Sequence, residues 1–445
     1  MTQLARKLRV VDYFTLGWGT MVGVGWLVVM DDWLSRGGVL GGVLGFAIGG
    51  LLLLPVGHIY GKLVAAIPDA AGEVAYTAKV FPRWISYFTG WMMVLSYFIV
   101  CPWEAVAVGK IAGYMFPAID SMEIYRVAGR PIYVPHLMVG LALTALLTGL
   151  NYRGIRLSAT FQNWTAFGTL ALFAAFVGFG ASKGSVSNFP PLFTHVPWVS
   201  VLLVLQIMPY YMTGFEAVVK GAEEARPELS AGGFSRAMWA AILVGIVFYA
   251  AIIAAVGYVA PWKDLLGERF MTAVAFERAT GSALIVKVIL AAALLSLVKC
   301  FNGNFVATSR LLFAMGRRGL VNPALSKVHA AHQTPPIAVL CIGIATAACM
   351  FLGDSILVPV SEVGSVAAAV GWLAACAAYL WMKPGITDVC IAGFGAVVGL
   401  LMVLMKVLPV VPGHFSGYEW LALGVWIALG MLLGRRNDDG RNPRQ

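Results

Sequence analysis

The feature that most constrains this chain is the recurrence, along its whole length, of apolar stretches long enough to cross a lipid bilayer as helices. A membrane-spanning helix needs about 20 mostly apolar residues. The sequence predicts twelve such spans, near 12–35, 39–64, 84–115, 136–150, 158–180, 198–222, 236–259, 284–315, 337–352, 356–381, 386–408 and 419–433. Only 12% of the 445 residues are charged, whereas a soluble domain carries about 25%. We therefore expect an all-α integral membrane protein and not a soluble enzyme.

Positively charged residues indicate which side of the membrane the connecting segments occupy. Lys and Arg are concentrated at the amino terminus and in the loops predicted to share its side, for example at Lys79, Arg153 and Arg317. Cytoplasmic loops carry such an excess. The sequence therefore predicts a multi-pass protein of the cell membrane whose terminal segments, 1–11 and 434–445, are both cytoplasmic. The net charge of +10 is then a signal of orientation in the lipid bilayer and not of a nucleic acid partner.

Two of the predicted spans contain residues that interrupt a helix at membrane depth. In the first, four glycines fall within the nine residues from Gly17 to Gly25, and in the sixth the run from Pro209 to Glu216 combines a proline, a glycine and an acid. Irregular backbone is tolerated inside a membrane where it lines a cavity. Interruptions in corresponding spans of two halves are typical of inverted repeats that bind a substrate between them. The alternative is that these glycines, Gly23 among them, only let helices pack closely.

Three motifs, occurring in this order, resemble the amino acid–polyamine–organocation superfamily of secondary transporters. The first is Gly-Thr-Met-Val-Gly-Val-Gly at 19–25, which is similar to the glycine-rich unwound segment of that superfamily. The second is Gly-Phe-Glu at 214–216, followed by Ala-Glu-Glu at 222–224. The third begins at Asn304 and continues through Ser-Arg at 309–310, which is similar to the end of the superfamily's eighth span.

The resemblance implies a leucine-transporter-like fold in which helices 1 and 6 are discontinuous. It implies two inverted repeats of five helices each, at 12–180 and 198–381, and two additional carboxyl-terminal helices at 386–433. The implied function is that of a secondary active transporter, or permease, which moves an amino acid or a related amine by alternating access. An exporter or antiporter of another small metabolite is the first alternative. An integral-membrane enzyme is the second, but the sequence shows no nucleophile motif of the kind such an enzyme needs, so we expect no enzymatic activity.

The same resemblance implies where the substrate binds. It assigns a substrate carboxylate to the backbone of the first unwound segment and a substrate amine to that of the second. Glycine lets backbone N–H groups approach an anion without a side chain in the way. Tyr210 lies where the superfamily has a gating aromatic residue. The alternative is that this tyrosine only packs against its neighbours. The candidate substrate-binding residues are Val22, Gly23, Val24, Gly25, Glu104, Tyr210, Thr213, Gly214, Phe215 and Asn304.

Ionisable side chains inside a span are costly and therefore mark candidate functional sites. Glu104 lies in the third span, where it would recognise a substrate amine or take up a proton; the alternative is a buried acid that only tightens packing. Lys299 lies deep in the eighth span and must reach a carboxylate, reach water or lose its proton. Asp31, near the outer end of the first span, either lines the entrance or takes part in coupling.

The sequence leaves open which ion drives transport. Some superfamily members carry a lysine in the fifth span in place of a sodium ion, and residues 158–169 contain none here. A sodium site would instead use carbonyls and hydroxyls of Gly19, Val22, Phe305, Thr308 and Ser309. The alternative is that these hydroxyls hydrogen-bond back to their own helix. Proton, sodium and exchange coupling therefore all fit, and the coupling candidates are Glu104, Lys299, Asp31, Thr308 and Ser309.

No motif indicates a metal site or a cofactor. The six histidines form no H-E-x-x-H pattern, the six cysteines form no C-x-x-C pair, and no glycine-rich loop carries the lysine of a nucleotide-binding P-loop. We therefore expect neither a resident metal nor ATP-driven transport by this chain itself.

Overall fold

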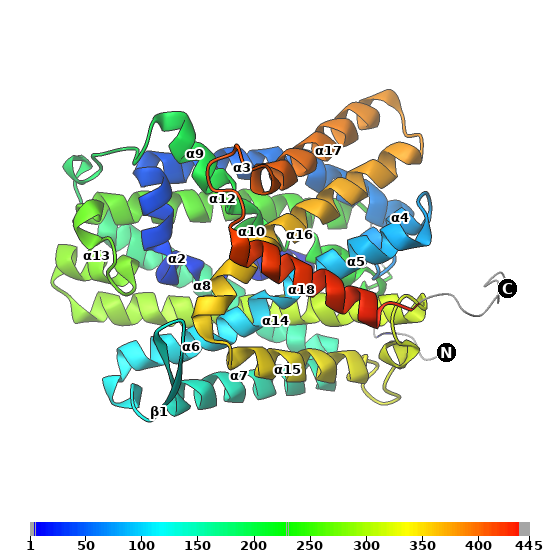
Figure 1. Ribbon diagram of the computed structural model, residues 1–445, viewed down its shortest axis with the longest axis horizontal. Coiled ribbons are helices and arrows are strands. Elements are labelled where there is room, and N and C mark those ends of the chain that lie inside the picture. Colours follow the sequence, from blue (N-terminus) through cyan, green and yellow to red (C-terminus); the bar gives the residue numbers. More distant parts are fainter. Residues whose placement is uncertain (1–3, 5, 228, 230, 436–445) are drawn as a thin grey trace.

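The computed structural model describes residue 4, residues 6–227, residue 229 and residues 231–435, without the side chains of 231 and 354–358. The described chain is almost entirely helical (Figure 1). The elements of its first half are α1 (Val10–Met21), α2 (Gly25–Val28), α3 (Met30–Ala66), α4 (Glu73–Ala78), α5 (Arg83–Phe98), α6 (Val100–Met115), η1 (Pro117–Ile119), β1 (Glu123–Val127), β2 (Arg130–Tyr133), α7 (Val134–Arg153), α8 (Ile155–Ala181) and η2 (Val186–Asn188). Those of its second half are α9 (Pro197–Leu205), α10 (Met208–Met212), α11 (Ala217–Lys220), η3 (Ala222–Glu224), α12 (Ala231–Val259), η4 (Trp262–Leu265), α13 (Met271–Thr280), α14 (Ala283–Arg317), η5 (Pro323–Ser326), α15 (Pro336–Met350), α16 (Gly353–Trp381), α17 (Ile386–Val407) and α18 (Gly417–Leu433).

Many of these helices are suited to a membrane. In the described part of the chain, eight segments are long and apolar enough to cross one: Met30–Ala66, Arg83–Met115, Val134–Arg153, Ile155–Ala181, Gly232–Val259, Ala283–Arg317, Pro359–Trp381 and Ile386–Val407. Two shorter apolar helices, α15 and α18, have 15 and 17 residues. Each of the ten coincides with a predicted span. The prediction of a helical multi-pass membrane protein is therefore confirmed.

The structure differs from the prediction mainly at the connections. The last residues of the first predicted span belong to α3, and the chain turns within that helix at Gly38, whose positive φ of 66° favours glycine. The connection between the predicted spans 84–115 and 136–150 contains an antiparallel hairpin of β1 and β2, in which Val127 pairs with Arg130. The helices α4 and α13 are also additions, with 6 and 10 residues. Such short elements carry too little periodic pattern to be read from the sequence.

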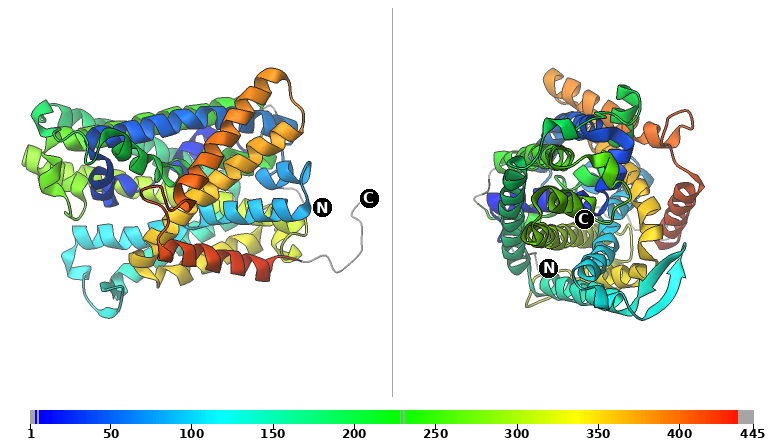
Figure 2. Two further views of the ribbon diagram at one scale, coloured as in Figure 1. Left: turned by 45° about the horizontal axis from the view of Figure 1, so that its top comes forward. Right: turned by 90° about the vertical axis from the view of Figure 1, so that its left-hand side faces the viewer.

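The long helices run side by side along the longest dimension of the molecule (Figures 1 and 2). The helix α3 packs against α12 and α9, while α14 packs against α8, α6 and α1. The helix α13 lies at one end of the long axis and α4 lies at the other (Figure 1), and these are called the α13 end and the α4 end below. The core between them holds fully buried aromatic side chains, including Trp18, Trp26 and Trp33. The two predicted interruptions lie among these long helices.

Candidate functional site

The first interruption separates α1 from α2. The helix α1 ends at Met21, Val22 is extended (φ −97°, ψ 97°), and α2 begins at Gly25. The carbonyl groups in the gap turn to α14, where the Ser296 hydroxyl donates to Val22 O at 3.2 Å and to Gly23 O at 2.7 Å. The break therefore exposes carbonyl oxygens to the neighbouring helix, as the glycine pattern predicts.

Lys299 brings a positive charge to the same carbonyls. Its side chain is fully buried, and Nζ donates a hydrogen bond to Val22 O. The ammonium also lies 4.4 Å from the centroid of the Trp18 ring, within the range of a cation–π contact. The carboxyl end of a helix carries a partial negative charge. The ammonium thus occupies the position that the end of α1 makes favourable for a cation.

Glu104 contacts the same interruption from another helix. It projects from α6, is 3% exposed, and accepts a hydrogen bond from the Val24 N–H through Oε1 at 3.2 Å. Its second oxygen, Oε2, is buried and has no hydrogen-bond partner among the described residues. The carboxylate lies so close to Gly23 that a Cβ at this position would collide with Oε1. The absence of a side chain at Gly23 therefore both allows Glu104 to pack closely and keeps the backbone of the interruption accessible.

The second interruption separates α10 from α11. The helix α10 ends at Met212, and Gly214 follows with a φ of 134°, which favours glycine. The Gly214 N–H donates to Glu216 Oε2 at 3.1 Å. A Cβ on Gly214 would lie only 2.5 Å from the Met21 nitrogen. The two interruptions therefore touch, although they are far apart in the sequence.

Two more candidates adjoin the interruptions, and a third packs into the core. Asn304 of α14 donates through Nδ2 to Thr20 O at 3.0 Å, while its Oδ1 is buried without a partner in the described structure. The Thr213 hydroxyl donates within its own turn, to Pro209 O at 2.7 Å. Phe215 is fully buried among aromatic rings. Asn304 thus adds a second unsatisfied acceptor beside the first interruption.

The candidate sodium ligands are engaged in other contacts. The hydroxyls of Thr308 and Ser309 donate to carbonyls of their own helix α14, at 2.7 and 3.0 Å, and the Val22 carbonyl accepts the lysine ammonium. Gly19 lies in α1 and Phe305 in α14. Within the described residues, no group of three or more His, Cys, Asp or Glu side chains could hold a metal ion. The two hydroxyls thus make the bonds within their own helix that the alternative to a sodium site predicts, and the Val22 carbonyl is bound by Lys299.

A cavity of about 250 Å³ leads toward the interruptions. Tyr210 is half-buried, lines this cavity and lies in the neighbourhood of Glu104. Asp31 lines the cavity as well. Arg269, two residues before the start of α13, donates to the backbone of the lining residue Lys110 at 2.8 Å and so places the cavity toward the α13 end. The lining residues are Val28, Val29, Asp31, Asp32, Arg36, Trp103, Lys110, Arg130, Ile207, Tyr210, Tyr211, Ser361, Glu362 and Ser365.

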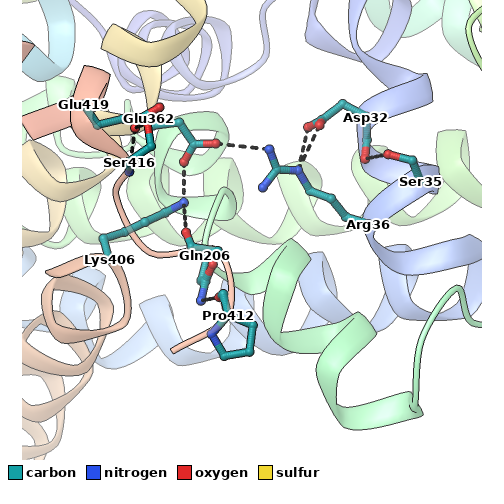
Figure 3. A network of polar contacts seen from close by, with 10 residues as sticks. Asp32, Ser35, Arg36, Gln206, Glu362, Lys406, Pro412, Ser416 and Glu419 are labelled. Carbon is teal, nitrogen blue, oxygen red and sulfur yellow. Dashed lines mark hydrogen bonds and ion pairs between the residues drawn. The ribbon is translucent and has the colours of Figure 1, made fainter. Parts of the chain in front are cut away.

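A chain of charged side chains crosses the wall of this cavity (Figure 3). Arg36 of α3 pairs with Asp32 at 2.9 Å and with Glu362 of α16 at 3.3 Å. Glu362 also pairs with Lys406 of α17, whose side chain is almost fully buried. The network thus ties three helices together. Lys406 was not a candidate from the sequence, although its position inside a predicted span was a usable signal.

Two buried ion pairs lie at the opposite, α4 end. Lys220 pairs with Glu73, and both side chains are completely buried; the Tyr60 hydroxyl also donates to Glu73 at 2.8 Å. Arg310 makes a two-pronged contact with Glu224, with both N···O distances at 3.2 Å. The pair of Arg310 and Glu224 joins the Ser-Arg motif to the Ala-Glu-Glu motif. The presence of both charges in these motifs was a signal that the sequence analysis did not use. In the first pair, the position of Lys220 inside the predicted span 198–222 was a usable signal, but nothing in the sequence pointed to Glu73 as its partner.

A more exposed cluster covers these buried pairs. Asp69 accepts hydrogen bonds from Arg317 at 3.2 Å and from Arg318 at 2.6 Å, and Arg317 also pairs with Glu223. Burial raises the pKa of Asp69, but the charge of Arg318, the Ala71 N–H and the charge of Arg317 outweigh it and hold this pKa below its ordinary value. The α4 end is therefore closed by layers of opposite charges.

Comparison with known proteins identifies the family. The sequence model of the amino acid permease family matches residues 8–431. The chain is 24% identical to the methylthioribose transporter of Bacillus subtilis (strain 168), over 97% of this chain and 93% of that protein. It is 24% identical to the branched-chain amino acid permease BcaP of the same organism (82% and 77% covered) and 27% identical to the gamma-aminobutyric acid permease of Escherichia coli (strain K12) (67% and 63% covered). Because the family match spans nearly the whole chain and confirms the resemblance of its motifs, this protein belongs to the amino acid permease family of membrane transporters.

Proposed function

We propose that this chain is a secondary active transporter that carries an amino acid or a related amine across the cell membrane by alternating access. The observation that carries the proposal is the contact of Gly214 with Met21, because it brings both helix interruptions to one buried site. Interrupted half-helices at membrane depth expose backbone groups that bind polar substrates and ions. The names of the relatives, two amino acid permeases and a methylthioribose transporter, support a small polar substrate.

The proposed architecture has twelve membrane spans. Eight long segments and two shorter apolar helices account for ten of them, and the interrupted runs α1–α2 and α9–α11 supply the other two. We assign residues 12–180 and 198–381 to two inverted five-helix repeats and 386–433 to two additional helices. The distribution of Lys and Arg supports cytoplasmic termini. Three of these residues, Arg436, Arg441 and Arg444, lie outside the described structure. In that orientation the α4 end faces the cytoplasm and the cavity faces outward.

The described conformation fits the outward-facing state of such a cycle. The cavity is on the α13 side, while buried ion pairs join Glu73 to Lys220 and Glu224 to Arg310 on the α4 side. Opening to the cytoplasm requires these two pairs to separate and become hydrated. In this proposal, the two buried ion pairs and the charged cluster around Asp69 form the cytoplasmic gate that alternating access requires.

The proposed substrate site lies behind Tyr210. A substrate that passes this side chain reaches the backbone of 22–25 and 213–215, where the interruptions meet. Glu104 and Asn304 line the same region, and each has a buried acceptor atom without a partner in the described structure. The site is therefore rich in acceptors for the hydrogen-bond donors of an ammonium group.

We place coupling at Lys299 and not at a sodium ion. Lys299 is held between the Val22 carbonyl and the Trp18 ring and interacts electrostatically with Glu104. A proton on this lysine thus supplies the positive charge that the end of α1 favours. Asp31 belongs to the cavity wall, which supports a role at the entrance.

Reconstitution of the purified full-length chain into liposomes tests this proposal. Uptake of radiolabelled amino acids and amines is measured under an imposed pH gradient, a sodium gradient or an internal load of unlabelled substrate. We expect uptake that responds to the pH gradient or to internal substrate and is indifferent to sodium. Sodium-dependent uptake would contradict the coupling assignment, and the absence of uptake of either substrate class would contradict the function.

A further inference from the structure

The oxygen Oε2 of Glu104, which has no hydrogen-bond partner in the described structure, indicates which class of substrate fits the site. Oε1 accepts the Val24 N–H at 3.2 Å, and Oε2 is enclosed without a hydrogen-bond partner in the described structure. A buried acceptor left unpaired costs free energy, and a charged one costs more. Lys299 is not the partner of Oε2, because its Nζ donates to the Val22 carbonyl and forms no ion pair with Glu104 among the described contacts. The Cys300 thiol also lies beside the carboxylate, but its single proton is donated to the Thr20 carbonyl at 3.0 Å, so we look to a donor from outside the chain as the partner of Oε2.

The same carboxylate also changes what the first interruption can bind. The amides freed by a broken helix attract anions, and the Val24 amide already holds the chain's own carboxylate. Glu104 lies against Gly23 so closely that no side chain fits between them. A carboxylate of a substrate brought to these amides would meet a second negative charge at short range in a low-dielectric site, where like charges repel strongly.

We propose that Glu104 takes the place of a substrate carboxylate at the first interruption, so that the chain selects organic amines that lack the α-carboxylate of an amino acid. This inference rests on the proposed transport function and narrows its substrate class. The ammonium of the substrate donates to Glu104 Oε2.

Other groups of the site match an amine in the same way. Asn304 uses its Nδ2 donors on the carbonyls of Thr20 and Cys300, at 3.0 and 2.9 Å, and leaves Oδ1 as a buried free acceptor in the described structure. Tyr210, which lines the cavity in the neighbourhood of Glu104, offers an aromatic ring, and such rings attract ammonium groups. The free groups of the site are thus acceptors and aromatic faces, as a cation requires.

Thermal-shift measurements on the purified full-length chain test the inference with matched ligand pairs. Each pair consists of an amino acid and the amine formed by its decarboxylation: leucine and 3-methylbutylamine, phenylalanine and 2-phenylethylamine, lysine and cadaverine. A ligand that binds the native state raises its stability. We expect at least one amine to raise the Tm and its parent amino acid to leave it unchanged at the same concentration.

Two variants separate the roles of the carboxylate. Glu104→Gln keeps an acceptor for the Val24 N–H but removes the charge, and we expect its affinity for the amine to fall by at least about 10-fold. Glu104→Ala frees the amide, and we expect the parent amino acid to gain stabilising power at the expense of the amine. Asp388→Asn, which alters an acid on α17 that pairs with Lys62 and His58, is the matched control and should leave both preferences unchanged. If Glu104→Ala does not fold, Glu104→Gln decides the question.

The outcomes distinguish this inference from the proposed function. If amino acids stabilise the wild-type chain and are transported while the amines are not, the inference fails and the transport function stands. Unchanged amine affinity in Glu104→Gln would also overturn it. If neither class stabilises the chain or is taken up by liposomes, both proposals fail.

Discussion

Removing one partner of the buried pair between Glu73 and Lys220 is expected to drive the transporter out of the proposed outward-facing conformation. Both side chains are completely buried at the α4 end. A buried ion pair that loses one member leaves an uncompensated charge, which costs about 3–5 kcal/mol. In the opposite conformation the α4 end opens and water hydrates the remaining charge. The cost therefore falls mainly on the outward-facing conformation.

The size of the shift follows from this difference. A bias of about 3 kcal/mol changes the ratio of two conformations by more than about 100-fold, because each 1.4 kcal/mol is about tenfold. Glu73→Gln and Lys220→Met are each expected to produce it. The double variant carries no charge at this position, and removing both charges of a buried pair is often neutral. We therefore expect the double variant to regain most of the outward-facing population.

The assay uses a cysteine in the cavity wall as a reporter. Val28 is half-buried and lines the cavity, so Val28→Cys is labelled by a membrane-impermeant thiol reagent while the cavity is open. Labelling should slow in each single variant and recover in the double variant. The chain without the new thiol gives the background from native cysteines. Arg278→Gln, which breaks an exposed pair with Glu268, is the control, since exposed pairs contribute only about 0–1 kcal/mol. Unchanged labelling in correctly folded single variants, or a double variant as slow as the singles, would refute the reasoning.

Three further predictions concern coupling, the helix contact and acid stability. Lys299→Met should abolish the response of uptake to a pH gradient but retain exchange of labelled for unlabelled substrate in liposomes; a persisting pH response would count against the coupling assignment. Gly214→Ala should lower the free energy of unfolding by about 1–3 kcal/mol or more, because it strains a positive φ and its Cβ would collide with the backbone of Met21. Gly424→Ala, which has no neighbour near its Cβ, is the control and should change the Tm little. The folded-state pKa of Asp69 is lowered, so its stabilising contribution is complete above its unfolded pKa of about 3.9 and is lost as the pH falls below that value. Asp69→Asn should therefore reduce thermal stability at neutral pH, and this reduction should shrink as the pH falls below about 3.9. A reduction that is as large in acid as at neutral pH would contradict this assignment.

The sequence contains enough information to locate the long helices and both interruptions. Apolar length sets the spans, and the glycines before Gly25 and the proline–glycine run after Pro209 mark where regular helix ends. The turn inside α3 also falls at Gly38, between the first two predicted spans. These features depend on residues close together in the chain. Local composition is therefore sufficient to predict them.

The ion pairs could not be predicted in the same way. Lys220 and Glu73 are 147 residues apart, and nothing local indicates that two charged side chains will neutralise each other in the interior. The partner of Lys406 was equally hidden, because it lies 44 residues earlier on another helix. The sequence can show that a buried charge needs a partner. Only the packing of the helices shows which partner it has.

Charge balance predicts that the proposed substrate binding and proton movement occur together in this site. Glu104 meets the amide side of the first interruption and Lys299 meets its carbonyl side, so that, with both groups ionised, their charges cancel across a few residues. An amine that enters as a cation adds one positive charge, and an uncompensated charge is costly in a low-dielectric interior. Loss of the proton from Lys299 restores neutrality without any other ion. A chain without this lysine keeps Glu104, the proposed ligand of the amine, but has no proton to release when the amine binds. Lys299→Met should therefore retain substrate exchange and lose the dependence of uptake on the pH gradient.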